Sequence, residues 1–156
     1  TSMSEETIFH KIVRGEIPCH KVWEDEKFLA FLSIFPNTEG VTVVIPKTYQ
    51  PSYFAEASDD ALAELVLAAK KVAKLLDAKL DDVGRTALVF EGFGVNYLHA
   101  KLFPMHGTKD MSSWQPIESQ DLKDLYFTTY PGYISSHDAQ VIDQEALALL
   151  SKRLQA

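Results

Sequence analysis

The feature that most constrains the fold is a long amphipathic helix predicted between two groups of strands. Apolar side chains recur there at intervals of three and four, as on one face of a helix: Leu62, Leu65, Val66, Ala69, Val72, Ala73 and Leu76. Ser58 is placed to cap the first turn, where Asp59 and Asp60 follow it. Such a helix must bury its apolar face against another layer of structure.

Strand signals lie on both sides of this helix. The candidate strands are residues 21–23, 28–33, 41–45, 86–90 and 95–104. A glycine loop, Glu91-Gly92-Phe93-Gly94, separates the last two, and a short helix of about two turns opens the chain at residues 8–13. This order predicts an α+β fold with an antiparallel sheet of about five strands, one long helix and one short helix.

The last third of the chain has a different character. After His106, aromatic residues, glycine, proline and serine are frequent as far as residue 140, and an amphipathic helix is predicted over residues 143–154. We expect one domain over residues 7–106, and a C-terminal extension over residues 107–156 that packs on it. A lid over a binding site is the second interpretation of the aromatic part.

Composition excludes several classes of protein. The chain has 15 Lys and Arg against 22 Asp and Glu, a formal net charge of -7, which argues against a nucleic-acid binder. A local pocket can still hold a small anion. The single cysteine, Cys19, excludes an internal disulfide. No apolar run approaches the roughly 20 residues of a membrane span, and the polar first residues do not resemble a signal peptide. We therefore expect a cytoplasmic protein without membrane contact.

The stretch that carries chemistry is the candidate strand that ends at Pro104. In a strand, Tyr97, His99 and Lys101 point to one face, and the apolar residues between them to the other. A neutral imidazole can attack phosphorus, and a nearby ammonium can stabilise the charge that develops on the phosphate oxygens. Taken alone, a histidine beside a lysine on a strand is more often part of a solvated face.

Four segments in order resemble the histidine-triad (HIT) superfamily. They are residues 7–18, 28–36, 40–47 and 95–104. The last stands where the family carries three histidines at alternate positions, often followed by proline. Anchoring on Pro104 puts His99 at the middle position, Tyr97 at the first and Lys101 at the third. The resemblance implies that His99 is the nucleophile, with Lys101 as electrostatic stabiliser.

The resemblance also implies a nucleotide site. Residues matching the base pocket are Phe9, Phe31 and Ile34, and those matching the phosphate cradle are Gly92 and Gly94. Ser33 replaces an aspartate that holds the ribose hydroxyls, and Phe93 falls where a phosphate donor is usual. Tyr97 would orient His99 through a hydrogen bond or simply pack. Glu91 would repel a phosphate if it faced the site.

The implied function is a nucleoside-phosphate hydrolase or nucleotidyl transferase that acts at the α-phosphorus, on nucleoside phosphoramidates or dinucleoside polyphosphates. The alternative is a non-catalytic nucleotide-binding or regulatory protein on the same fold, which the departures at Tyr97, Ser33 and Phe93 favour. A third is an interaction protein that works through the aromatic C-terminal segment. The resemblance further implies a homodimer whose sheets join, and we expect no cofactor.

Other histidines are weighed separately. Thr7, His10 and Tyr49 stand where some family members carry zinc ligands, so we expect no bound metal. Strand parity puts His106 opposite His99, unless a bend at Pro104 brings it back. His137 lies in a loop where a function is plausible, although a capped turn at Asp138 is the simpler interpretation. His20 is expected to be solvated.

Overall fold

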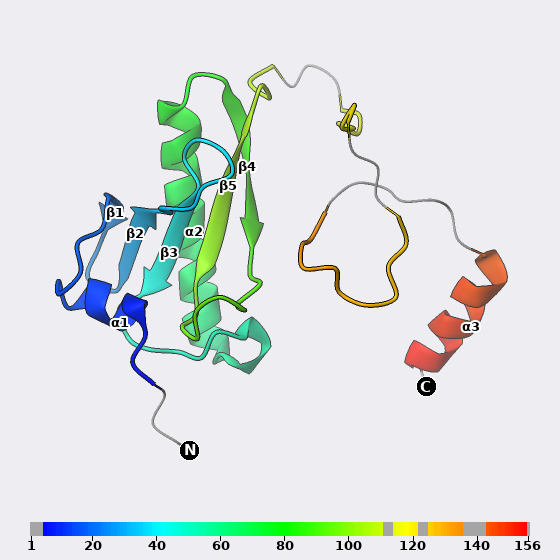
Figure 1. The fold of residues 1–156 in the computed structure, drawn as a ribbon, viewed down its shortest axis with the longest axis horizontal. Helices are drawn as coiled ribbons and strands as arrows, with labels where there is room; N and C mark the ends of the chain where they lie inside the picture. The colour runs from blue at the N-terminus through cyan, green and yellow to red at the C-terminus, as the bar shows by residue number, and fades with distance from the viewer. Residues whose placement is uncertain (1–4, 111–113, 122–124, 136–142, 156) are drawn as a thin grey trace. The chain divides into compact units, whose positions relative to one another are not determined.

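The computed structural model describes residues 5–110, 114–121, 125–135 and 143–155. The chain divides into two compact units, residues 1–112 and residues 113–156. The first unit contains the sheet and its two helices, and the second contains a C-terminal helix (Figure 1).

Five antiparallel strands form the sheet, in the order β1-β2-β3-β5-β4. Their bounds are β1 (Lys21–Glu24), β2 (Phe28–Leu32), β3 (Thr42–Pro46), β4 (Val83–Val89) and β5 (Ala100–His106). Asp25 closes the β1–β2 turn, because its carboxylate accepts hydrogen bonds from the N–H groups of Lys27 (2.9 Å) and Phe28 (2.7 Å). The predicted α+β fold with an antiparallel sheet is confirmed.

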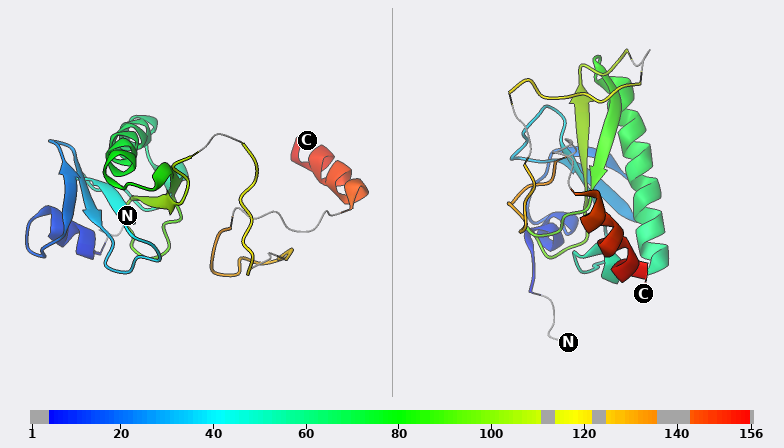
Figure 2. Two further views of the ribbon diagram at one scale, coloured as in Figure 1. Left: turned by 90° about the horizontal axis from the view of Figure 1, so that it is seen from above. Right: turned by 90° about the vertical axis from the view of Figure 1, so that its right-hand side faces the viewer.

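Helix α2 (Asp59–Lys79) lies along one face of the sheet (Figure 2). Ser58 caps it, as predicted, by accepting a hydrogen bond from the N–H of Ala61. Its buried face consists of Leu65, Ala68, Ala69, Val72 and Leu76. Val66, which the periodicity placed on this face, is instead exposed. The buried face of α2 is therefore turned slightly about the helix axis from the predicted face.

Helix α1 (Ile8–Val13) packs on a second apolar cluster. Ala30, Val44 and Ala100 belong to the core beneath α2, while their neighbours Phe31 and Val43 belong to the cluster that includes Phe9 and Ile12 of α1. This alternation follows from the period of two along a strand. The sheet therefore has a hydrophobic core on each of its faces.

The strand expected over residues 95–104 is displaced along the chain. β5 begins at Ala100 and continues to His106, so Tyr97 and His99 precede it. The N–H of Tyr97 donates to the carbonyl of Val95 (2.8 Å), which closes a tight turn ahead of the strand. Pro104 is accommodated inside β5 because pairing with β3 ends at Leu102, which leaves β4 as the neighbour there.

β4 begins earlier than the expected residue 86, at Val83. Its second residue, Gly84, lies against the chain that follows β5: a Cβ atom at this position would lie 2.2 Å from the carbonyl oxygen of Thr108. The N–H of Gly84 donates to Thr108 Oγ1 (3.1 Å). This close backbone approach requires glycine.

The second unit contains helix α3 (Gln144–Gln155), which confirms the helix expected near the C-terminus. None of its residues is buried, and Leu154 is 74% exposed. That the extension packs on the domain stays a prediction. Within the described ranges, no helix combines the length and the apolar character needed to cross a membrane.

Candidate active site

A cavity of about 460 Å³ lies on the α1 side of the sheet. Its walls come from residues 8–20, from residues 31–35 at the end of β2, and from residues 91–95, together with Val43, His99 and Lys101. Most of the residues predicted for the site line it: Phe9, Phe31, Ser33, Ile34, Gly92, Gly94, His99 and Lys101. Tyr97 does not line it and is buried. The structure thus brings the predicted residues together, while their roles stay predictions.

His99 is buried in the cavity wall, with its ring edge-on to Phe9 at a centroid distance of 5.1 Å. Its Nδ1 lies 2.6 Å from the carbonyl oxygen of Tyr97. A carbonyl can only accept a hydrogen bond, so Nδ1 carries a proton and the neutral ring has its lone pair on Nε2. Burial lowers the pKa of His99 below its ordinary value, against the opposing effect of the Tyr97 carbonyl. The neutral ring is therefore favoured.

Lys101 is brought to the cavity by the register of the sheet. Phe31 pairs with Val43, and Val43 pairs with Lys101, so the three residues form a row across β2, β3 and β5. All three line the cavity. Lys101 is the one Lys or Arg that does so in the described part of the chain, and its charge also lowers the pKa of His99.

Glu91 also lines the cavity, on the loop before Tyr97. It is half-buried, and its negative charge is a minor influence that raises the pKa of His99. Among the described residues it is the one Asp or Glu in the cavity wall. The site therefore includes one acidic and one basic side chain besides its histidines, whereas a phosphate cradle normally presents positive charge and N–H donors.

Several wall residues were not foreseen from the sequence. Cys19 and His20 line the cavity, although His20 was expected to be merely solvated, and so does Phe35, which is 88% exposed. Phe93, which the resemblance placed near the phosphate, also lines the cavity and is 80% exposed. The pairing of β1 with β2 explains the first two: the N–H of Leu32 donates to the carbonyl of His20 (2.9 Å), which places this segment beside the end of β2. The sequence signal that could have indicated this contact is the turn-forming stretch around Asp25, which joins the candidate strands 21–23 and 28–33 as a hairpin.

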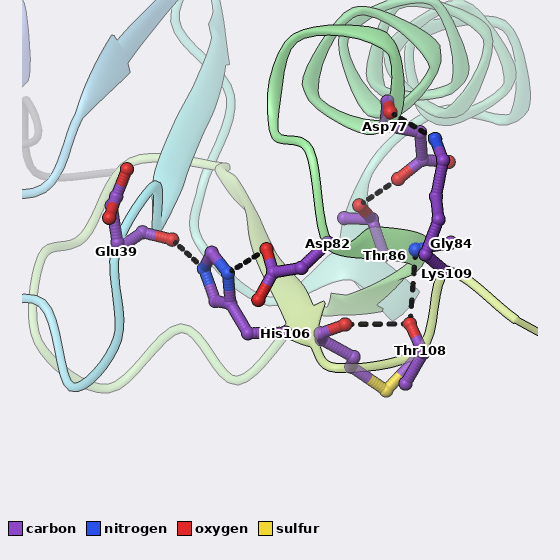
Figure 3. Close-up of polar contacts among 9 residues, drawn as sticks. Glu39, Asp77, Asp82, Gly84, Thr86, His106, Thr108 and Lys109 are labelled. Carbon is purple, nitrogen blue, oxygen red and sulfur yellow. Dashed lines mark hydrogen bonds and ion pairs between the residues drawn. The ribbon is translucent and has the colours of Figure 1, made fainter.

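His106 does not line the cavity. β5 continues through Pro104 instead of bending back, and at its end His106 Nδ1 lies 2.8 Å from Asp82 Oδ1 while Nε2 lies 2.7 Å from the carbonyl oxygen of Glu39 (Figure 3). The Glu39 carbonyl, followed by the Asp82 carboxylate, raises the pKa of His106. His106 links the end of β5 to the start of β4 and to the loop before β3. His137 lies outside the described residues.

Thr7, His10 and Tyr49 lie together at the start of α1. Thr7 and His10 form a capping box in which the N–H of Thr7 donates to His10 Nδ1 (3.0 Å), and the His10 ring stacks on Tyr49 at 4.9 Å. Across the described residues, no group of three or more His, Cys, Asp or Glu is placed to hold a metal ion. The expectation that zinc is absent stays a prediction.

Comparison with known proteins adds independent findings. A family model described as HIT domain matches residues 14–108. An uncharacterized HIT-like protein of Methanocaldococcus jannaschii is 33% identical over 126 residues, which cover 76% of this chain and 94% of that protein. The adenosine 5'-monophosphoramidase of Schizosaccharomyces pombe is 38% identical over 101 residues, 62% of this chain and 72% of that enzyme. The crystal structure of a HIT family member from Bacillus subtilis superposes with a TM-score of 0.62 at 28% identity, over 97% of this chain and 96% of that one.

Proposed function

The chain belongs to the HIT domain family, and from this premise we propose that it is a nucleoside-phosphate hydrolase or nucleotidyl transferase that acts at the α-phosphorus through His99. One observation carries the proposal. The bond from His99 Nδ1 to the Tyr97 carbonyl leaves the lone pair on Nε2, in a cavity that Lys101 also lines. An uncharged imidazole with a cation beside it suits attack on a phosphate ester or amide.

In the proposed reaction, Nε2 forms a bond to the α-phosphorus while the bond from phosphorus to the leaving group breaks. The leaving group keeps the electron pair of that bond and takes a proton from water. The Lys101 ammonium stabilises the negative charge on the phosphoryl oxygens, and the Tyr97 carbonyl stabilises the positive charge that the ring acquires. Water, or an acceptor alcohol or amine in a transfer, then attacks phosphorus and releases a proton to the solvent. The bond from phosphorus to Nε2 breaks, its electron pair returns to the ring, and neutral His99 is restored.

The rest of the cavity supports a nucleotide as the ligand. The apolar side chains of Phe9, Phe31 and Ile34 would hold the base, and Ser33 lies on the same wall, where it would contact the ribose. Gly92 and Gly94 would bring backbone N–H groups to the phosphate. The relative from Schizosaccharomyces pombe is an adenosine 5'-monophosphoramidase, so adenosine 5'-phosphoramidate is the first substrate to test.

The test is turnover of adenosine phosphoramidates and dinucleoside polyphosphates by the wild type, His99→Ala and Lys101→Met. We expect His99→Ala to lose about three orders of magnitude or more in kcat, because it lacks the nucleophile, and Lys101→Met to lose about two. When the enzyme is mixed with substrate and denatured rapidly without acid, mass spectrometry should find a nucleotidyl adduct on His99. Absence of turnover by the wild type, or equal turnover by wild type and His99→Ala, would contradict the catalytic proposal.

A non-catalytic nucleotide-binding protein is the second candidate. Glu91 in the cavity wall and the exposed ring of Phe93 at its edge favour it, because neither group assists phosphoryl transfer. Calorimetric titration with adenosine 5'-monophosphate distinguishes the two. Binding without turnover of any compound in the panel would support this alternative.

We also propose that the protein forms a homodimer through β4. The sheet ends in β1 and β4, and β4 has seven residues against four in β1. A long edge strand is the better template for pairing with a second copy. Light scattering should give twice the chain mass of 17.5 kDa, and the mass of a single chain would contradict the proposal.

A further inference from the structure

The backbone that holds His99 lies outside the hydrogen-bonded ladder of the sheet. The last residue pair that joins β3 to β5 at this end is Val44 with Ala100, and His99 precedes it. Beyond that pair, the hydroxyl of Tyr97 donates to the carbonyl oxygen of Pro46 at 2.5 Å. The Tyr97 side chain thus connects the segment before β5 to the end of β3, at a point where backbone pairing between the two strands has ended.

The Tyr97 ring is fixed on its remaining sides by other rings. It meets His10 at a centroid distance of 5.0 Å, Tyr49 at 5.3 Å and Phe9 at 5.9 Å, each time edge to face. Tyr97 is 1% exposed. The N–H of Leu98, the next residue, donates to the carbonyl of Gln50 (2.8 Å). The carbonyl of Tyr97, which lies between these contacts, therefore has little freedom to move.

We propose that Tyr97 is a positioning residue, whose hydroxyl bond to Pro46 holds its own carbonyl against His99 Nδ1 and so keeps Nε2 as the unprotonated nitrogen. The inference rests on the proposed function, in which Nε2 is the attacking atom. Tyr97 acts through its backbone carbonyl on His99, while its side chain supplies the anchor. This distinguishes it from a residue that merely fills the core.

The proposal has a chemical consequence. A neutral imidazole places its single ring proton on whichever nitrogen has the better acceptor. Without a fixed carbonyl beside Nδ1, the proton distributes over both nitrogens, and the fraction of rings that can attack phosphorus falls. Substrate contacts with Phe31 and Lys101 would be unaffected, so kcat should fall while KM stays nearly constant.

The test compares Tyr97→Phe with Tyr49→Phe. Each variant removes one hydroxyl from the same group of rings and keeps the ring itself. The Tyr97 hydroxyl donates to Pro46, whereas within the described ranges the Tyr49 hydroxyl has no hydrogen-bond partner. Thermal unfolding establishes that both variants are folded at the assay temperature. The readouts are kcat and KM with the best phosphoramidate substrate, and the imidazole nitrogen-15 shifts of His99.

We expect Tyr97→Phe to lower kcat about fivefold to twentyfold, the effect of one hydrogen bond, with KM within about twofold. Its His99 shifts should move from one protonated Nδ1 toward an average of two tautomers, while Tyr49→Phe matches the wild type in both readouts. Unchanged shifts and unchanged kcat in Tyr97→Phe would overturn the inference. If the wild type turns over no substrate, the proposed function fails, but the nitrogen shifts still decide whether Tyr97 positions His99.

Discussion

His106 makes two hydrogen bonds that require its protonated form, and this gives the fold a dependence on pH. Asp82 Oδ1 and the Glu39 carbonyl both accept, so both ring nitrogens must donate, and the pKa of His106 is raised in the folded state. The group's contribution to stability is fully present below its unfolded pKa of about 6.5 and is lost as pH rises through the folded value. When the His106 ring loses a proton, it keeps one N–H group and can donate to only one of the two acceptors, Asp82 Oδ1 or the Glu39 carbonyl.

We therefore predict that His106→Gln destabilises the protein more at low pH than at high pH. Urea unfolding of the wild type and the variant from about pH 5.5 to about pH 8.5 measures the difference. His20→Gln, which changes an exposed histidine, is the control and should leave the pH dependence unchanged. A difference between wild type and His106→Gln that is the same at every pH would contradict the prediction.

At the residue scale, the sequence predicted which face of the sheet a side chain occupies wherever the alternation along a strand decides it. Parity placed His99 and Lys101 on one face and Leu98, Ala100 and Leu102 on the other, and both groups lie as expected. The hydrogen bond from the Tyr97 hydroxyl to Pro46 was not predictable, because Pro46 is 51 positions away along the chain. The entry of Glu91 into the cavity depends likewise on the loop conformation before β5.

At the scale of elements, β4 contains Gly84, which leaves less room for a side chain than the other glycines of the described residues. A methyl group on Gly84 would lie 2.2 Å from the Thr108 carbonyl oxygen, a backbone atom that cannot rotate away. We predict that Gly84→Ala lowers the free energy of unfolding by about 2 kcal/mol or more, because β4 must shift away from the chain after β5. Gly94→Ala is the control, since its Cβ would meet nothing within 4 Å, and it should change stability by less than about 0.5 kcal/mol. Equal stability of the two variants in urea unfolding would contradict this.

Elements with strong local signals were predictable, and those shaped by distant partners were not. Ser58 and the periodicity after it located α2, and the short helix predicted over residues 8–13 coincides with α1. The start of β5 was wrong because the bend at Val95–Tyr97 and the bond from Leu98 to Gln50 replace ladder pairing there. No local pattern in the sequence indicates those contacts.

At the scale of the whole molecule, the two units differ in what holds them together. Residues 1–112 include both hydrophobic clusters, whereas α3 has 12 residues and none of them is buried. Isolated helices of this length are marginal in water. We predict that a chain ending at residue 112 still unfolds cooperatively, while the fragment from residue 113 onward shows little helix by circular dichroism. A stable helix in the isolated fragment, or loss of cooperative unfolding in the shorter chain, would contradict this.

The composition and the order of elements predicted the class of fold, but not the strand order. That β5 lies between β3 and β4 follows from pairings such as Val43 with Lys101, which join residues far apart in the sequence. The resemblance in four segments predicted which residues share one site, which the local patterns did not indicate. Residues 107–156 lay outside that resemblance, and the expectation that they pack on the domain stays a prediction.

The cavity walls come from residues 8–20, 31–35 and 91–95 and from Val43, His99 and Lys101, which meet only when the chain is folded. Any compound that fills the cavity therefore binds the folded chain and not the unfolded one. At one hundred times its Kd, such a compound adds about 2.7 kcal/mol to the free energy of unfolding. A compound that occupies the cavity thus raises Tm whether or not His99 reacts with it, so nucleotides can be ranked by their effect on thermal unfolding without an assay of turnover.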